Sequence, residues 1–405
     1  MLSSSESMTL KDTTINRILM ICPQFRPIVG GYERAAERLS AALVRRGLGV
    51  TVVTERRIST WPTIEQIEGF HVVRYPIIYR QGFHRISSTI SFMAYMLIKG
   101  RSFVIWHLHQ YGDHGVVTLI LACLFRRPVV LKLTSTGVMG LARSVSSASP
   151  ILGRMTRRLY SRIDGCVVTS GEALQEALNA GIARDRIHLI PNGVDCKLYA
   201  PASRQDKVQL RRQLGIAPDC LLVLYVGRLS PEKNPDGLLQ AWAPVVRAFP
   251  NARLAYIGEG PSAAALGNAV KSAKMSESVI LAGQSDVTHD WYRASDLYVL
   301  PSHIEGLSNS LLEAMSCGLP VVSTKVSGSV DIFAAADIGE IVAVGDTPAL
   351  ATAVMHLLEN GEQRRTCGDH ARNYAVQQYS IDSVAARVVD MYASLCSEMS
   401  KIPLV

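Results

Sequence analysis

Short apolar runs alternate along the chain with stretches of helical length, and this alternation constrains the fold more than any other feature. The runs are 17–22, 50–54, 70–75, 103–109, 129–133 and 165–169 in the first half, and 221–227, 252–258, 279–282, 296–300 and 320–324 in the second. A strand that is apolar throughout is buried on both faces, which is typical of parallel sheets covered by helices on each side. The sequence therefore predicts an α/β fold with two doubly wound, Rossmann-like domains.

Turn chemistry at 190–195, Ile-Pro-Asn-Gly-Val-Asp, separates the two halves. We expect an N-terminal domain over 1–195 and a C-terminal domain over 196–378. Ligands of doubly wound domains bind outside the carboxyl ends of the strands. Two such domains that face each other would form a cleft there, so the loops after the strands are the candidate site.

Composition narrows the class of protein. Of the 405 residues, 48% are hydrophobic and 19% are charged, which is enough for two cores and excludes intrinsic disorder. The eight cysteines form no C-x-x-C pair, which is typical of reduced thiols and gives no support to a zinc knuckle. No apolar run reaches the length of a membrane span. We expect a cytoplasmic protein, either soluble or peripheral to a membrane.

The charge balance is basic, with 42 lysine and arginine residues against 34 acidic ones and a net charge of +8. Such a balance suits phosphorylated substrates and anionic lipid. Five arginines gather within 143–162: Arg143, Arg154, Arg157, Arg158 and Arg162. The segment 151–163 predicts a short helix whose basic side is either an ordinary solvated face or a contact with an anionic membrane.

Two loops carry residues suited to a diphosphate. Gly30 and Gly31 lie between the first strand and the first helix, where glycine allows close approach of a ligand and the helix start offers free N–H groups. Arg228 follows the strand 221–227, and Lys233 precedes an expected N-cap at Asn234 with proline next to it. A cation at a helix N-terminus is unfavourable unless an anion binds there. Flexible turns and solvated charges are the simpler alternatives.

The most specific motif is the string 301–320, PSHIEGLSNSLLEAMSCGLP. Glu305 lies in the loop after a strand and Glu313 lies eight residues later in a helix. A carboxylate accepts hydrogen bonds from two vicinal sugar hydroxyls. Alternatively, Ser310 and Glu313 form a capping box, and Glu305 is a solvated loop residue.

This string resembles the E-x7-E segment of the family-four retaining glycosyltransferases, the glycosyl transferases group 1, which have the GT-B fold. VGRLSPEKN resembles the donor-diphosphate loop of that family, and IPNGVD its segment between domains. The resemblance implies a hexosyltransferase that uses a nucleotide-sugar donor and a glycan, glycolipid or other hydroxyl acceptor, without a cofactor, a metal or a nucleic-acid partner. It also implies that a C-terminal helix at about 379–405 packs back on the N-terminal, acceptor-side domain.

The resemblance assigns roles to individual residues. Arg228 and Lys233 would hold the diphosphate, with Gly30 and Gly31 against it from the other domain. Glu305 would bind the transferred sugar, and Glu313 the ribose. The remaining substrate-binding residues it implies are Gly306 and Leu307 beside the sugar, Gly283 and Gln284 beside the base, and Ser308.

One position departs from the family pattern, and two other functions stay open. Many members have a histidine where this chain has Thr134, and His109 is the residue that would compensate. One of these two functions is a nucleotide-sugar 2-epimerase on a similar fold, which would bind the donor diphosphate in the same way but would need no acceptor. The cluster from His107 to His114, with Asp113, contains ligands that suit zinc and so leaves a metallo-hydrolase as an alternative.

Overall fold

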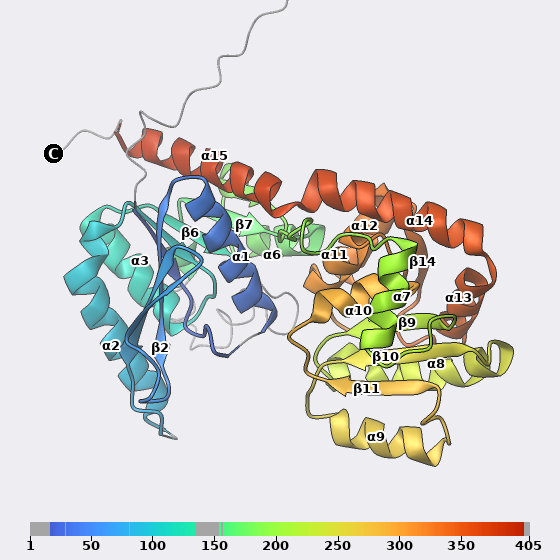
Figure 1. Ribbon diagram of the computed structural model, residues 1–405. Coiled ribbons are helices and arrows are strands. Elements are labelled where there is room, and N and C mark those ends of the chain that lie inside the picture. Colours follow the sequence, from blue (N-terminus) through green and yellow to red (C-terminus); the bar gives the residue numbers. More distant parts are fainter. Residues whose placement is uncertain (1–16, 29, 81, 134–153, 155–156, 401–405) are drawn as a thin grey trace, which may run out of the picture.

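The computed structural model describes residues 17–28, 30–80, 82–133, 154 and 157–400. Figure 1 shows two lobes, one formed by the first half of the chain and the other by the second. Most of the basic segment 143–162 lies outside the described residues, although Arg154, Arg157 and Arg158 are described and exposed. In the described ranges, no helix is long and apolar enough to cross a membrane.

The N-terminal lobe is built on a sheet that has eight strands among the described residues, in the order β3-β4-β2-β1-β5-β6-β7-β8. Its strands are β1 (Arg17–Ile21), β2 (Gly49–Arg56), β3 (Ile64–Ile67), β4 (Phe70–Pro76), β5 (Ile105–Leu108), β6 (Val129–Lys132), β7 (Gly165–Val168) and β8 (Ile187–Leu189). Every pairing is parallel except that of β3 with β4. Helices α1 (Gly31–Arg45), α2 (His84–Lys99), α3 (Asp113–Phe125) and α6 (Gly171–Asn179) cover this sheet.

The C-terminal lobe has a parallel sheet of six described strands in the order β11-β10-β9-β12-β13-β14. Its strands are β9 (Leu221–Val226), β10 (Ala252–Ile257), β11 (Val279–Gly283), β12 (Leu297–Leu300), β13 (Val321–Thr324) and β14 (Gly339–Val342). Its helices are α7 (Arg204–Gln213), α8 (Pro235–Ala248), α9 (Ala263–Ser272), α10 (Thr288–Ala294), α11 (Asn309–Ser316), α12 (Ser327–Ala335), α13 (Thr347–Glu359) and α14 (Gly361–Tyr374). The predicted pair of doubly wound domains is confirmed.

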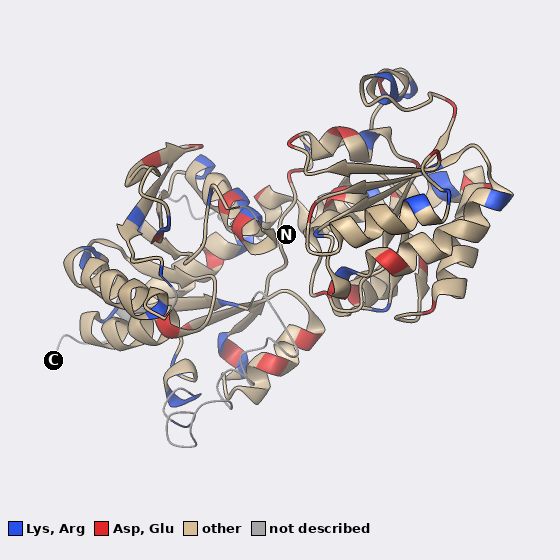
Figure 2. Ribbon diagram, turned by 90° about the horizontal axis from the view of Figure 1, so that it is seen from below, with Lys and Arg blue, Asp and Glu red and all other residues tan. Residues whose placement is uncertain are grey.

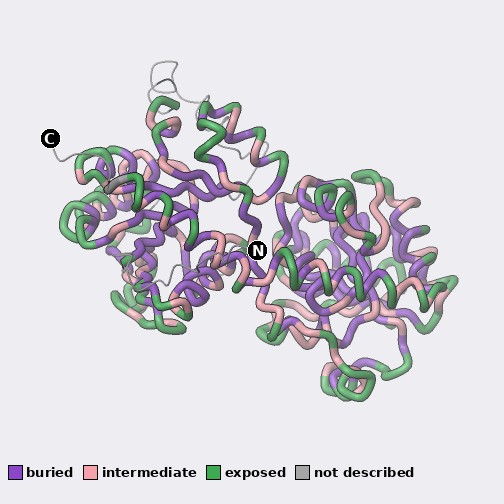
Figure 3. The backbone as a smooth tube through the Cα atoms, turned by 90° about the horizontal axis from the view of Figure 1, so that it is seen from above, coloured by how far each residue is buried: buried purple, intermediate pink, exposed green. Residues whose placement is uncertain are grey.

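Burial follows the predicted pattern. Figure 3 shows the strands buried through the middle of each lobe, with helices that alternate between buried and exposed sides. Charged residues lie over the outer surfaces of both lobes (Figure 2). β3 was not predicted, because its alternating residues at the edge of the sheet form no apolar run.

The last helix, α15 (Ile381–Ser400), lies along the N-terminal lobe (Figure 1). Val384, Val388 and Tyr392 from this helix join the core that α1 forms with the sheet of that lobe. The chain therefore returns to its first domain after completing the second, and apolar packing holds it there.

Candidate active site

A cavity of about 880 Å³ lies between the carboxyl ends of the two sheets. Most of the predicted residues line it: Gly30, Gly31, His109, Arg228, Lys233, Gln284, Glu305, Gly306, Leu307, Ser308 and Glu313. Gly283, the last residue of β11, is not among the lining residues. Its carbonyl accepts a hydrogen bond of 2.8 Å from the Gly258 N–H, so it shapes the strand end beside Gln284.

Lys233 and Glu305 form an ion pair on the C-terminal side of the cavity. Lys233 ends a short 3-10 helix (Pro231–Lys233), and the Asn234 side chain caps α8 by accepting from the Gly237 N–H at 3.1 Å. The expected N-cap is thus present, and Lys233 lies directly before it. The charge of Lys233 is thus balanced by Glu305, the carboxylate that the family resemblance assigns to the transferred sugar.

Arg228 extends from the loop after β9 and is exposed. The Tyr225 hydroxyl donates to the Arg228 carbonyl at 2.9 Å and fixes the backbone of this loop. Gly258, at the end of the neighbouring strand β10, has φ +141, and a Cβ there would lie 2.0 Å from the Gly227 carbonyl oxygen. Only glycine therefore allows the two strand ends to approach this closely beside Arg228. This requirement on Gly258 was missed in the sequence.

Glu313 is buried in α11, and protein groups hold both of its carboxylate oxygens. Arg38 of α1 pairs with one oxygen, and the Tyr292 hydroxyl donates to the other at 2.9 Å. The N-cap of α11 is Ser308, whose hydroxyl accepts from the Leu311 N–H at 3.4 Å. The alternative capping box of Ser310 with Glu313 is wrong, because Ser310 lies inside the helix and the Glu313 carboxylate faces another domain.

The glycine loop of the N-terminal domain meets the opposite domain directly. Asn309 donates from its side-chain amide to the Gly31 carbonyl at 2.7 Å. Glu33, in the first turn of α1, turns its carboxylate toward Gly30, where a Cβ would lie 2.5 Å from its Oε2 atom. A side chain at position 30 would therefore displace the Glu33 carboxylate from its present place beside the cavity. Sequence reasoning missed Glu33, because an acidic residue in the first turn is ordinary.

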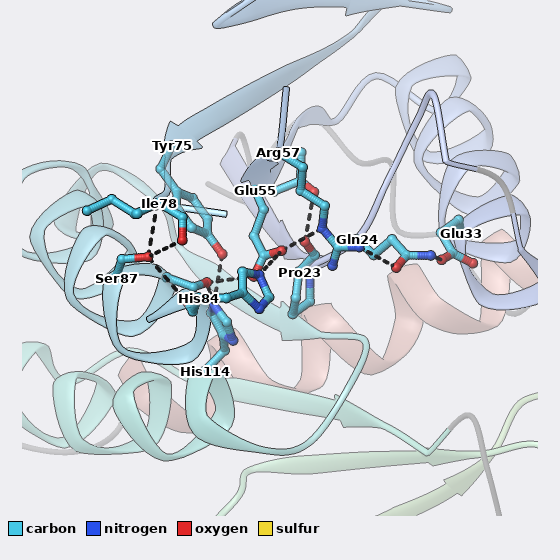
Figure 4. A network of polar contacts seen from close by, with 12 residues as sticks. Pro23, Gln24, Glu33, Glu55, Arg57, Tyr75, Ile78, His84, Ser87 and His114 are labelled. Atoms are coloured by element: carbon cyan, nitrogen blue, oxygen red, sulfur yellow. Dashed lines mark hydrogen bonds and ion pairs between the residues drawn. The ribbon is translucent and has the colours of Figure 1, made fainter. Parts of the chain in front are cut away.

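Glu33 belongs to a network of polar side chains that also contains Gln24, Arg57 and Glu55 (Figure 4). Gln24 donates to Glu33 at 2.6 Å, and Arg57 joins Gln24 to the buried Glu55. Burial raises the pKa of Glu33. Burial would also raise that of Glu55, but hydrogen bonds from Ser88 and Arg57 outweigh it and lower the Glu55 pKa. This network favours the ionised form of Glu55 and fixes the orientation of the Glu33 carboxylate at the cavity.

Lys132, at the end of β6, contributes a further cation to the cavity, in addition to Arg228 and Lys233. It is 3% exposed, and burial lowers its pKa to about 8. Among the described residues no carboxylate forms an ion pair with it. His109 also lines the cavity, and its buried Nδ1 atom has no hydrogen-bond partner among the residues that the structure describes. Sequence reasoning missed Lys132, because the residue completes an apolar strand.

The structure does not bring the cluster from His107 to His114 together. His107 and His109 stack at 4.4 Å between ring centroids, and the Tyr392 hydroxyl lies 2.5 Å from His107 Nδ1. His114 instead lies 2.8 Å from the Tyr75 hydroxyl, in the network of Figure 4. No group of three metal-ligating side chains is found where the structure describes the chain. The interpretation of this cluster as a zinc site is therefore wrong.

Two family models match the chain. "Glycosyl transferase 4-like domain" matches residues 30–193, and "Glycosyl transferases group 1" matches residues 206–374. Together the two models cover most of both domains, and the cavity lies between the two matched regions. The chain is a group 1 glycosyltransferase. Its two facing Rossmann-like domains are the GT-B fold, as the resemblance predicted.

Several individual proteins are similar to this glycosyltransferase. It is 23% identical to N-acetyl-alpha-D-glucosaminyl L-malate synthase of Bacillus anthracis, over 90% of this chain and 94% of that protein. It is 31% identical to D-inositol 3-phosphate glycosyltransferase 2 of Catenulispora acidiphila, over 56% of this chain and 54% of that protein. The solved structure of HepE of Anabaena in complex with UDP-glucose has 20% identity and a TM-score of 0.76, over 93% of this chain and 99% of that one.

Proposed function

We propose that this glycosyltransferase moves a hexose-type sugar from a nucleotide-diphosphate-sugar to an acceptor hydroxyl, with retention of anomeric configuration. The observation that carries the proposal is the meeting of Arg228, Lys233 and Glu305 at the carboxyl end of the C-terminal sheet. HepE, which shares the fold, binds UDP-glucose. That complex supports a donor of the same kind here.

The ion pair of Lys233 and Glu305 is consistent with a diphosphate site, because a diphosphate can replace the carboxylate as the partner of Lys233. As the bond from the anomeric carbon to the diphosphate oxygen breaks, negative charge grows on the leaving group and positive charge on the sugar. Arg228 and Lys233 stabilise the first charge, since preorganised cations need no rearrangement during the step. A diphosphate that binds Lys233 releases the Glu305 carboxylate, which then accepts hydrogen bonds from the sugar.

We also propose that the acceptor carries a negative charge, which Lys132 binds. Burying an ammonium group without an ion-pair partner is unfavourable, so an anion that binds Lys132 would relieve the penalty. β6 lies two strands from β1 in the sheet, so these two strands are about 10 Å apart, and Lys132 and the glycine loop both line the cavity. The names of two relatives give acceptors with carboxylate or phosphate groups, malate and inositol 3-phosphate. These names support an anionic acceptor without identifying it.

A screen of nucleotide-sugars tests the proposal through release of free nucleoside diphosphate. Each donor is incubated alone, with malate, with inositol phosphate, and with neutral sugars. We expect release to depend on an anionic acceptor and the product to keep the anomeric configuration of the donor. Release without any acceptor, together with a sugar inverted at C2, would support the epimerase instead.

The same assay repeated in EDTA tests the expectation that no metal is needed. Arg228, Lys233 and helix N-termini supply the positive charge that a metal would otherwise provide. We expect the rate with EDTA to equal the rate without it. A rate that falls on chelation and returns with a divalent cation would contradict this part of the proposal.

A further inference from the structure

Two helices of the N-terminal domain expose large apolar side chains to solvent. On α2, Ile86, Ile90, Met93 and Leu97 recur at intervals of three or four residues, with exposed fractions of 61%, 56%, 40% and 48%. This spacing places them along one side of the helix. The opposite side of α2, with Ser88, Phe92 and Met96, is buried against the domain.

The neighbouring helix α3 has the same character. Ile120 and Leu124 are 52% and 64% exposed and lie one turn apart. α2 and α3 pack side by side (Figure 1), and their inner faces share one core over the same face of the sheet. Their outer faces therefore point to the same side of the molecule. Exposed apolar residues in such number on adjacent elements mark an interaction surface. We call these six residues the α2–α3 face.

The charged residues around the α2–α3 face are mostly basic. From 77 to 127 the chain has six basic residues and a single acidic one, Asp113, which pairs with Arg85 at 2.8 Å. The basic residues are Arg80, Arg85, Lys99, Arg101, Arg126 and Arg127. Arg127 donates to the Arg101 carbonyl at 2.8 Å, so the C-terminal ends of the two helices lie together. Lys99, Arg101 and Arg126 are exposed at these ends.

We propose that the α2–α3 face binds an anionic lipid membrane. An apolar stripe bordered by lysine and arginine, on helices too short to span, is the arrangement of a helix that lies in the membrane interface. A second copy of the chain is a poorer occupant, because pairing two such faces would bring basic rims together. The face is separate from the cavity residues, so the inference does not depend on the donor or the acceptor.

Sedimentation of the full chain with lipid vesicles tests the inference, without donor or acceptor present. One set of vesicles is pure phosphatidylcholine, and the other contains phosphatidylglycerol as well. We expect binding to the anionic vesicles to be at least tenfold stronger and to fall as salt is added. Equal binding to both sets, or no binding to either, would overturn the inference.

Matched variants locate the binding surface. Ile86→Glu with Ile90→Glu should lower the vesicle partition coefficient more than tenfold. Lys99→Gln and Arg126→Gln should each lower it about fivefold on anionic vesicles alone. Val330→Glu with Val344→Glu places the same two charges on exposed apolar residues of the C-terminal domain and should leave vesicle binding unchanged. All these positions are exposed, so the substitutions should leave the fold intact. Thermal melts of each variant check this.

Light scattering after gel filtration measures the molar mass and so tests whether the α2–α3 face binds a second copy of the chain instead. We expect a monomer both for the wild type and for the variant with Ile86→Glu and Ile90→Glu. A wild-type dimer that this variant converts to a monomer would show that the face binds a second copy and would overturn the inference. Unchanged vesicle binding by this variant would do the same.

Discussion

Arg38 of α1, which is partly buried, and Glu313 of α11, which is buried, form an ion pair that joins the two domains. Burial alone would lower the pKa of the Arg38 guanidinium, but the charge of Glu313 outweighs burial and raises it. The Arg38 guanidinium also lies 5.3 Å from the centre of the Tyr199 ring. The carboxylate that we assign to the ribose is thus oriented by a side chain of the opposite domain.

Arg38→Met should weaken binding of the free nucleoside diphosphate about tenfold, because Glu313 loses the charge that orients it. Calorimetric titration of Arg38→Met, Glu313→Gln and the double variant measures the coupling. We expect the two effects to be non-additive by about 1–3 kcal/mol, as for directly paired groups. Arg45→Met, on the exposed side of α1, is the control. Strictly additive losses would show that Arg38 acts independently of Glu313.

Lys233→Ala should lower kcat/KM by the equivalent of about 2–4 kcal/mol, because it removes a preorganised charge beside the leaving diphosphate. Steady-state kinetics with every accepted donor provide the measurement. Lys271→Ala removes an exposed lysine from α9 and should leave the kinetics unchanged. Near-wild-type kcat/KM in Lys233→Ala would remove this residue from the proposed mechanism.

Glu305→Gln and Glu313→Gln should fail in different ways. Glu305 is assigned to the sugar, where positive charge develops, so its loss should lower kcat more than donor affinity. Glu313 is assigned to the ribose, which is present with or without the sugar, so its loss should weaken binding of the nucleoside diphosphate itself. Pre-steady-state kinetics and calorimetry separate the two. Unaltered nucleotide affinity in Glu313→Gln would leave this residue only the role of joining the domains.

Lys132→Met should stabilise the protein while it weakens binding of an anionic acceptor. Burial lowers the Lys132 pKa from 10.5 to about 8, so between these values the unfolded chain binds more protons than the folded one. The free energy of unfolding attributable to Lys132 therefore rises with pH across this window, and below pH 8 the penalty is up to about 3 kcal/mol. Urea unfolding of wild type and variant at pH 7 and pH 10 measures it.

The variant should be more stable than the wild type at pH 7, and the difference should shrink at pH 10. Lys132→Met should also raise KM for an anionic acceptor and leave KM for the donor unchanged. A loss of stability at pH 7 would show that the Lys132 ammonium already has a favourable partner in the protein, which would contradict its assignment to the acceptor.

Most strands could be predicted, because continuous apolar runs such as 221–227 are buried on both faces and leave few alternatives. Edge strands were harder to find. β3 alternates between half-buried and exposed residues, and β8 and β14 are short and contain polar or charged residues. The loops that carry Arg228, Lys233 and Glu305 were predictable for a local reason, since each directly follows a strand of a parallel sheet.

The sequence by itself determined the two α/β domains, the cleft at their strand ends and the motif residues that line it. Only the tertiary structure decided which residues face one another: Lys233 with Glu305, and Arg38, which the sequence analysis did not single out, with Glu313, 275 residues apart. It also separated His114 from His107 and placed Lys132 in the cavity. Local patterns record burial and turns, whereas contacts between distant residues depend on how two domains dock, and no short-range periodicity encodes that arrangement.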